Sequence, residues 1–325
     1  MNETVIGEAK NSPLRCRTFV RGLQQMPAIL LWVSCGRGSM DSDTKGVLLI
    51  VLSATSFGTL GVLGKYASAA GLSIPTVLAY RFLGGTFLIW TLVAYRGNLR
   101  RLRGRTLGVA ILLGAGFYAA QSGLYFLGLE YMTAGLVGLV LYTYPALVVV
   151  LSYVFLDERI TRHTVAGLVL AMGGVAVVSG FDPVGADPRG IAVVLGAALV
   201  YAGYYVTSHV ALADVNSQTL TAYVLPSAGV SFVVFGLATD SLTIPATSYE
   251  VTVLAMVALV GTAIPIGAFF AGLAYIGASR ASIISSLEPA TAVFLGVLLI
   301  DEPLAPATVV GGVLVLVGVL VIQRE

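Results

Sequence analysis

Long apolar segments recur along almost the whole chain, separated by short polar loops. A helix that crosses a lipid bilayer needs about 20 consecutive, mostly apolar residues. Loops with turn-forming residues, such as Asp182-Pro183 and Asp301-Glu302-Pro303, separate segments of about this length. The segments are residues 46–67, 74–95, 106–127, 131–156, 164–180, 190–213, 219–239, 251–275, 280–300 and 306–322. The sequence therefore predicts an all-α, polytopic membrane protein with ten transmembrane helices.

The composition agrees with this class and excludes others. Only 10% of the 325 residues are charged and 57% are hydrophobic, whereas soluble domains carry about 25% charged residues. An ordinary soluble enzyme and a disordered chain are therefore excluded. The net charge of +2 does not indicate a nucleic-acid partner.

The second half of the chain repeats the first at an offset of 144 residues. Residues 128–178 and 272–322 are identical at 18 of 51 positions without gaps, including tyrosine, proline, aspartate, glutamate and glycine pairs. We expect two five-helix repeats, residues 40–180 and 181–325. Because five is odd, the second repeat should enter the membrane inverted. Inverted repeats are typical of secondary transporters, and duplication without mechanistic meaning is the alternative.

Basic residues predict the orientation. Fifteen of the 18 Lys and Arg residues fall on one predicted side, which includes the 96–105 and 157–163 loops. Lys65 and Arg189 fall on the other side. Because cytoplasmic loops are enriched in Lys and Arg, we expect both termini to be cytoplasmic.

Residues 1–39 differ from the rest of the chain. They contain five basic residues and one apolar run, residues 26–35, which is too short to span a membrane. We expect this segment to be a disordered or non-native extension. A signal peptide is the alternative, because a basic stretch precedes a short apolar core.

Several short motifs resemble those of a known family. They are Tyr80-Arg81-Phe82-Leu83, Tyr144-Pro145, Asp157-Glu158-Arg159, Ser279-Arg280-Ala281, Leu287-Glu288-Pro289 and Asp301-Glu302-Pro303-Leu304. Over about residues 46–322 the sequence resembles the EamA family of the drug/metabolite transporter (DMT) superfamily. The resemblance implies ten helices around a central cavity, with the fifth and tenth peripheral. It also implies transport of small metabolites, often amino acids or related compounds, and frequently export.

Two ionisable residues lie deep in predicted helices. Glu288 is about 12 Å into the 280–300 segment, and Arg81 is about 10 Å into the 74–95 segment. Intramembrane charges are costly and mark functional sites by default. Glu288 either binds solute or couples protons, or it supports a kinked helix. Arg81 either binds a substrate carboxylate through the paired N–H donors of its planar guanidinium group, here called its fork, or locks its helix to a neighbour.

Pro145 and Pro289 occupy equivalent positions in the two repeats. Each removes a backbone donor inside an apolar segment and frees the carbonyl four residues earlier. Paired helix breaks point to a transporter's binding site. Ser285, which supplies one freed carbonyl, and Tyr144, which aligns with Glu288, are therefore candidate binding residues.

Two apolar segments carry aromatic or polar stripes. Tyr118, Gln121 and Tyr125 share one helical face, and Tyr201 and Tyr205 are four residues apart on another. We take Tyr118, Gln121 and Tyr205 as further candidate binding residues. An aromatic stripe suits an apolar or aromatic solute, and it suits helix packing equally well.

Small residues form a face on the 46–67 segment. Gly58, Gly61 and Gly64 are three residues apart, a spacing that indicates close helix approach.

Motifs for catalysis are absent from the sequence. It has no Walker A glycine loop, no His-Glu-x-x-His and no Gly-x-Ser-x-Gly. We expect no cofactor, no metal site and no enzymatic activity. The sequence predicts a cell-membrane secondary transporter that moves a small organic metabolite by alternating access, driven by a proton or other ion gradient or by the solute's own gradient. An intramembrane enzyme and a channel are the alternatives.

The predicted topology can be tested by labelling. In a variant whose two native cysteines are replaced, cysteines introduced at Asn98 and at Ala186 should label from opposite sides of the membrane in intact cells. The loops that carry them follow an even and an odd number of predicted spans, respectively. Labelling of both from the same side would contradict the helix count and the inverted repeat.

Overall fold

The described part of the chain is helical throughout. The computed structural model describes residues 42–96, 101–156, 161–181, 187–211 and 215–322, and these contain no β-strand. The elements, with π-helical turns labelled η, are α3 (Ser42–Gly58), α4 (Leu60–Ala69), α5 (Ile74–Arg96), α6 (Gly104–Ile111), η3 (Leu112–Tyr118), α7 (Ala119–Tyr131), α8 (Ala134–Leu141), α9 (Tyr144–Leu156), α10 (Arg162–Phe181), α11 (Pro188–Ala211), α12 (Ser217–Ala238), α13 (Ser248–Ala258), η4 (Leu259–Ala263), α14 (Ile264–Ser285), α15 (Leu287–Ile300) and α16 (Pro306–Ile322). The predicted all-α class is confirmed. The predicted 1–39 extension lies outside the described residues.

Several helical stretches suit a bilayer by length and composition. Among the described residues, seven stretches are long and apolar enough to cross a membrane: Ser42–Ala69, Gly104–Tyr131, Ala134–Phe155, Pro188–Ser208, Ser217–Ala238, Ser248–Gly277 and Ile283–Ile300. Val165–Val178 and Pro306–Ile322 are shorter apolar helices. The helix α5, which carries Arg81, belongs to neither set. These helices indicate a multi-pass membrane protein, and the count of ten spans stays a prediction.

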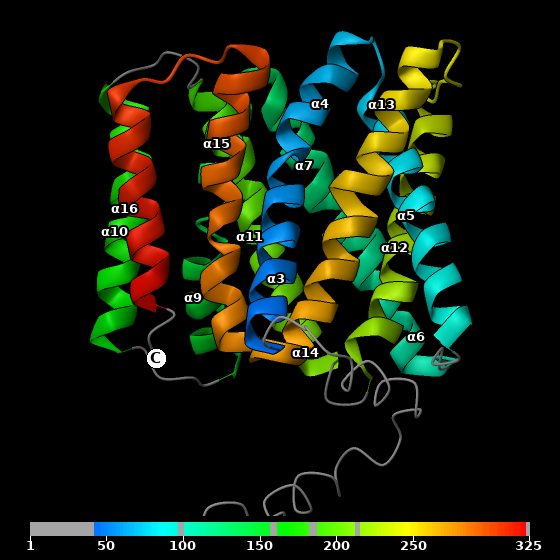
Figure 1. Cartoon of the computed structure of the whole chain (residues 1–325), viewed down its shortest axis with the longest axis horizontal. Helices are drawn as coiled ribbons and strands as arrows, with labels where there is room; N and C mark the ends of the chain where they lie inside the picture. Colours follow the sequence, from blue (N-terminus) through cyan, green and yellow to red (C-terminus); the bar gives the residue numbers. More distant parts are fainter. Residues whose placement is uncertain (1–41, 97–100, 157–160, 182–186, 212–214, 323–325) are drawn as a thin grey trace, which may run out of the picture. The chain divides into compact units, whose positions relative to one another are not determined.

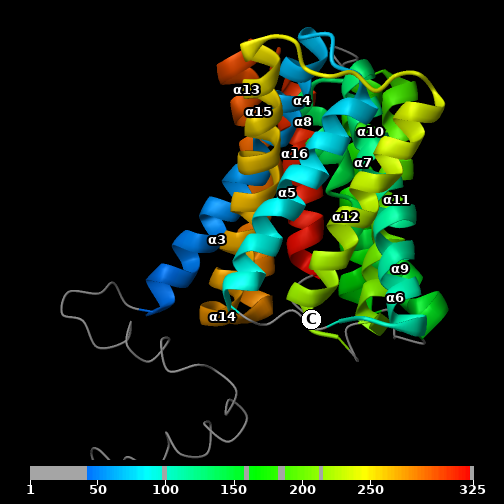
Figure 2. The ribbon, with the colours of Figure 1, turned by 90° about the vertical axis from the view of Figure 1, so that its right-hand side faces the viewer.

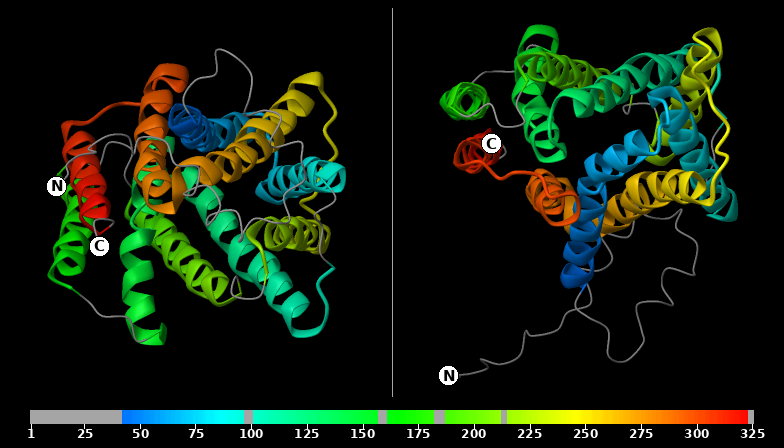
Figure 3. Two further views of the ribbon diagram at one scale, coloured as in Figure 1. Left: turned by 60° about the horizontal axis from the view of Figure 1, so that its bottom comes forward. Right: turned by 90° about the horizontal axis from the view of Figure 1, so that it is seen from above.

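The helices α10 and α16 pack along each other, as Figures 1 and 3 show. A Cβ atom on Gly167 would lie 2.5 Å from the carbonyl oxygen of Gly318, and one on Gly174 would lie 2.5 Å from that of Gly311. The later residue of α10 thus meets the earlier residue of α16, so the two helices run antiparallel. Glycine at these positions allows backbone to touch backbone.

The α5 helix lies between α12 and α13 (Figure 2). Its Trp90 Nε1 donates a hydrogen bond to the carbonyl oxygen of Ala222 on α12, at 2.7 Å. On the opposite flank, Gly84 of α5 packs against Ala258 of α13. Contacts on both flanks hold α5 at a fixed position, which matters because α5 carries Arg81.

The predicted small-residue face of the first apolar segment is confirmed. A Cβ on Gly58 would lie 2.7 Å from Cβ of Thr291 on α15, and one on Gly61 would lie 2.9 Å from Cβ of Ala134 on α8. A Cβ on Gly64 would lie 2.5 Å from Leu129 on α7. The α3–α4 stretch therefore approaches three other helices at distances that only glycine allows.

Two glycines that are 144 residues apart pack against two tyrosines that are also 144 residues apart, each glycine against the tyrosine of the other half. Gly46 on α3 packs against Tyr275 on α14, and a Cβ there would lie 2.7 Å from the Tyr275 Cβ. Gly190 on α11 packs in the same way against Tyr131 on α7, at 2.8 Å. Such an exchange is the contact pattern that a two-fold axis produces.

The side chain of Glu302 ties the chain segment after α15 to the start of α8. Its Oε1 accepts a hydrogen bond from the backbone N–H of Ala134 at 2.6 Å, and its Oε2 accepts one from Gly135 at 3.2 Å. A Cβ on Gly296 would collide with this carboxylate. The first N–H groups of a helix have no partner within the helix and favour negative charge. Glu302 therefore supplies hydrogen-bond acceptors and negative charge to the α8 N-terminus.

Replacing Glu302 by Gln should therefore destabilise the protein. The amide keeps one acceptor but loses the charge, and its NH₂ group faces a second N–H. We expect the free energy of unfolding to fall by about 1.5–3 kcal/mol, as measured by SDS titration in mixed micelles. The exposed Glu130 provides the control, because Glu130→Gln removes the same charge from solvent. Equal stability of the two variants would contradict the capping role.

Candidate functional site

Both predicted helix breaks are present, and each precedes its proline. The α8 helix ends at Leu141, and α9 begins at Tyr144 with Pro145 in its first turn. The α14 helix ends at Ser285, and α15 begins at Leu287 with Pro289 in its first turn. A first-turn position tolerates proline because its missing N–H has no helical partner there. The sequence suggested proline inside a continuous helix, whereas each proline opens a new helical segment.

The α14 helix is also interrupted once within its length, before it ends at the break that precedes α15. Gly277, inside α14, has φ 76° and ψ 169°, which interrupts the helix. The α14 residues after Gly277 correspond to α8 by the 144-residue offset. The two halves thus share a short helix, a break and a proline-opened helix. The residues between the helices of each pair are Tyr142 and Thr143, which are buried, and Ser286, which is half-buried.

Tyrosine side chains gather where α9, α11 and η3 meet. The ring centroids of Tyr144 and Tyr201 are 4.6 Å apart, and those of Tyr144 and Tyr205 are 5.1 Å apart. The hydroxyl oxygens of Tyr144 and Tyr205 are 3.5 Å apart. Tyr118 joins the group through Tyr204, with ring centroids 5.4 Å apart. We call Tyr118, Tyr144, Tyr201, Tyr204 and Tyr205 the tyrosine cluster.

The side chain of Arg81 is buried next to this cluster, with 3% of its surface exposed. Its Nε donates a hydrogen bond to Oγ1 of Thr262, at 3.0 Å. Its guanidinium carbon lies 4.9 Å from the ring centroid of Phe82, which is a cation–π distance. The two Nη nitrogens form no hydrogen bond with any described residue. Neither of them is fully enclosed by protein. The planar fork of Arg81 is therefore unpaired.

Glu288 lies in the first turn of α15, directly before Pro289. Its carboxyl group lies within electrostatic range of the Arg81 guanidinium. In the described part of the chain no ion pair within 4 Å joins these two side chains. The site thus contains a guanidinium and a carboxyl group that are near each other but form no direct ion pair.

Most of the predicted binding residues lie around Glu288. Its charge reaches Tyr118, Tyr144 and Tyr201 of the tyrosine cluster, and Tyr205 contacts Tyr144 directly. Tyr125 and Tyr142 also lie within reach of the Glu288 charge.

Two predicted residues are less central. Gln121 is buried, and its Oε1 accepts a hydrogen bond from Ser122 at 3.1 Å. Ser285 ends α14 beside the break. Thr262 and Tyr204 lie at the site but were not predicted from the sequence as binding residues. For Tyr204 the neighbouring stripe was a usable signal, whereas for Thr262 only its alignment with Tyr118 pointed there.

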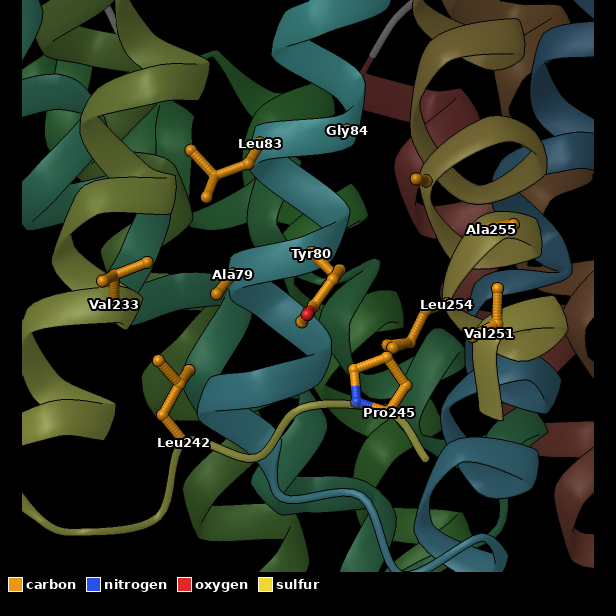
Figure 4. A pocket seen from close by; sticks show the side chains of 11 residues that line it. Ala79, Tyr80, Leu83, Gly84, Val233, Leu242, Pro245, Val251, Leu254 and Ala255 are labelled. Carbon is orange, nitrogen blue, oxygen red and sulfur yellow. The ribbon is translucent and has the colours of Figure 1, made fainter. Parts of the chain in front are cut away.

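A separate groove opens between α5, α12 and α13 (Figure 4). Its volume is about 470 Å³, and its lining includes Leu83, Val233, Leu242 and Leu254. Tyr80 projects into it from α5. The lining contains no charged side chain, so this groove lacks the groups that recognise a polar solute.

Comparison with known proteins identifies the family. The sequence pattern of the EamA-like transporter family matches residues 44–180 and again residues 188–324. The chain belongs to this family. The second EamA match begins 144 residues after the first, which is the offset of the sequence repeat.

Curated relatives of this EamA chain are named as transporters. An uncharacterized transporter from Archaeoglobus fulgidus is 27% identical over 86% of this chain and 98% of its own length. The uncharacterized transporter YcbK from Bacillus subtilis is 26% identical over 82% of this chain and 88% of its own length. A probable terminal-alkyne amino-acid exporter from Streptantibioticus cattleyicolor is 27% identical over 86% of this chain and 92% of its own length.

A solved crystal structure shares the fold. It superposes with a TM-score of 0.62 at 20% identity, covering 85% of this chain and 97% of the other. The two chains therefore share a fold over most of their length.

Proposed function

We propose that this EamA protein is a secondary transporter that binds a small carboxylate-bearing metabolite between Arg81, Glu288 and the tyrosine cluster. The observation that carries the proposal is the fork of Arg81, whose Nε is held while both Nη nitrogens lack a partner among the described residues. A buried guanidinium without an anion is costly inside a membrane. A substrate carboxylate matches the fork in two parallel hydrogen bonds.

Glu288 and the tyrosine cluster complement Arg81. A solute that carries an amino group as well as a carboxylate would place its positive end near Glu288 and its negative end near Arg81. The tyrosine rings offer flat faces to the rest of the molecule, and ring edges and faces favour aromatic or apolar groups. An amino acid or a related compound has these three features, and one relative is named as an amino-acid exporter. We propose the same solute class for this chain.

Alternating access requires two halves that exchange conformations. We propose that residues 40–180 and 181–325 are inverted five-helix repeats, with ten spans in total. Support comes from the antiparallel α10 and α16 and from the exchanged contacts of Gly46 and Gly190. In this arrangement the site lies where the halves meet, because Arg81 comes from the first and Glu288 from the second. We propose that the protein lies in the cell membrane with both termini in the cytoplasm, and the distribution of Lys and Arg among the loops supports this orientation.

Glu288 is the group that we propose for ion coupling. The titratable and charged side chains within electrostatic range of it are Arg81 on α5, Tyr118 on η3, Tyr125 on α7, Tyr144 on α9 with the neighbouring Tyr142, and Tyr201 on α11. Arg81 is the one cation in this set. If the Glu288 carboxyl group releases its proton when it binds solute or when it interacts with Arg81, transport becomes linked to a proton gradient.

Counterflow in proteoliposomes tests the solute class through Arg81. Lysine keeps the charge but loses the fork, so Arg81→Lys should raise the apparent KM for carboxylate-bearing solutes about ten- to hundredfold. The KM for the matching amides should stay unchanged, and the melting temperature should change little. The exposed Arg105 gives the matched control, Arg105→Lys. A locking role for Arg81 would give the reverse, with lower stability and unchanged affinity.

Glu288→Gln separates binding from coupling. Glutamine keeps the shape and much of the hydrogen bonding but cannot change its charge. The variant should insert normally and exchange solute across the membrane, and it should lose both gradient-driven accumulation and the pH dependence of transport. Accumulation at the wild-type level with wild-type pH dependence would rule out the coupling role.

A further inference from the structure

The η4 turn gives Thr262 an unusual hydrogen-bonding position. In this π-helical turn the Thr262 hydroxyl donates to the carbonyl oxygen of Val257, five residues earlier, at 3.2 Å. A hydroxyl has one proton to donate and lone pairs that accept. Because the proton is directed to Val257, the lone pairs remain for the Nε–H of Arg81. Thr262 is fully buried, so solvent does not compete for either bond.

The α5 helix has a glycine, Gly85, at the position where Thr262 contacts it. A Cβ on Gly85, one turn after Arg81, would lie 2.8 Å from the Cγ2 methyl of Thr262. Glycine therefore lets η4 approach α5 closely enough for the hydrogen bond. Arg81 and Gly85 share one face of α5, so the methyl and the hydroxyl of one side chain contact that face together.

The first half of the chain has a π-helical turn at the matching place. Tyr118 ends η3 and precedes Thr262 by 144 residues. Its ring centroid lies 5.3 Å from that of Phe82, the residue that follows Arg81. Each repeat thus uses a π-helical turn to bring one side chain to the same segment of α5. Such turns are frequent at functional sites.

We propose that Thr262 is a positioning residue that aims the Arg81 fork and thereby sets the preference for carboxylate-bearing solutes. This inference rests on the proposed function. A guanidinium on a flexible side chain can present its two Nη nitrogens in many directions. With Nε anchored to Thr262 and the guanidinium beside the Phe82 ring, the plane of the guanidinium is fixed, and so is the direction of its two Nη nitrogens.

A graded series at position 262 tests this role in the same counterflow assay. Serine keeps the hydroxyl, cysteine supplies only a weak acceptor, and valine supplies none. The apparent KM for a carboxylate-bearing solute should rise in the order Ser, Cys, Val, reaching about three- to tenfold above wild type in Thr262→Val. The maximal rate and the KM for the matching amide should stay within about twofold of wild type.

A purely structural role predicts a different pattern. In that case the variants would lose rate and thermal stability for both solutes alike, and the carboxylate-to-amide KM ratio would not change. That result, or an unchanged KM in Thr262→Cys and Thr262→Val, would overturn the inference. If valine prevents insertion, the cysteine variant alone decides the question, because its KM ratio must lie above that of serine.

Failure of this inference can be told apart from failure of the proposed function. If Arg81→Lys weakens carboxylate affinity while every variant at position 262 keeps it, only the positioning role of Thr262 is wrong. If wild-type protein treats carboxylate and amide alike, the proposed solute class itself is wrong.

Discussion

The arrangement of the site depends on the burial of a guanidinium in an apolar helix bundle. A charged residue at the centre of a membrane helix costs at least about 2.5–3.5 kcal/mol on insertion scales. Arg81 offsets part of that cost through Thr262 and the ring of Phe82, and its two Nη nitrogens have no partner in the part of the chain that the structure describes. A site that is stabilised only when an anion arrives has a physical reason to bind one, and this makes the fork of Arg81 the centre of the proposed solute site.

Glycine residues allow the surrounding helices to pack closely, and several of these contacts are equivalent in the two halves of the chain. Gly46 and Gly190 pack against tyrosines that are themselves 144 residues apart, and the glycines of α10 and α16 pair in reverse order. Equivalent contacts contribute similar packing free energies in the first and in the second half of the chain. Equivalent packing of this kind supports the proposed exchange of conformations between the two halves, which the proposed alternating access around Arg81 and Glu288 requires.

The sequence predicted the helical class and the helix breaks because both depend on local chemistry: apolar length, proline and the repeat offset. It also predicted Arg81, Glu288 and Tyr144 as candidates, because a charge or a break inside an apolar segment stands out. It did not predict the bond between Arg81 and Thr262, whose partners are 181 residues apart and whose threonine resembles any other small polar residue. From the sequence, Glu302 was recognised only as part of a turn and of a family motif, and not as a helix cap. Its capping of α8 depends on the space that Gly296 leaves, which local patterns do not report.

The central claim is that one solute lies between Arg81 and Glu288, and an experimental structure with a transported carboxylate-bearing solute bound tests it most directly. The solute carboxylate should lie within hydrogen-bond distance of both Nη nitrogens of Arg81, with Thr262 still on Nε and a tyrosine of the cluster against the solute. A solute bound instead in the groove lined by Leu83 and Leu254, with the Arg81 fork unoccupied, would contradict the claim.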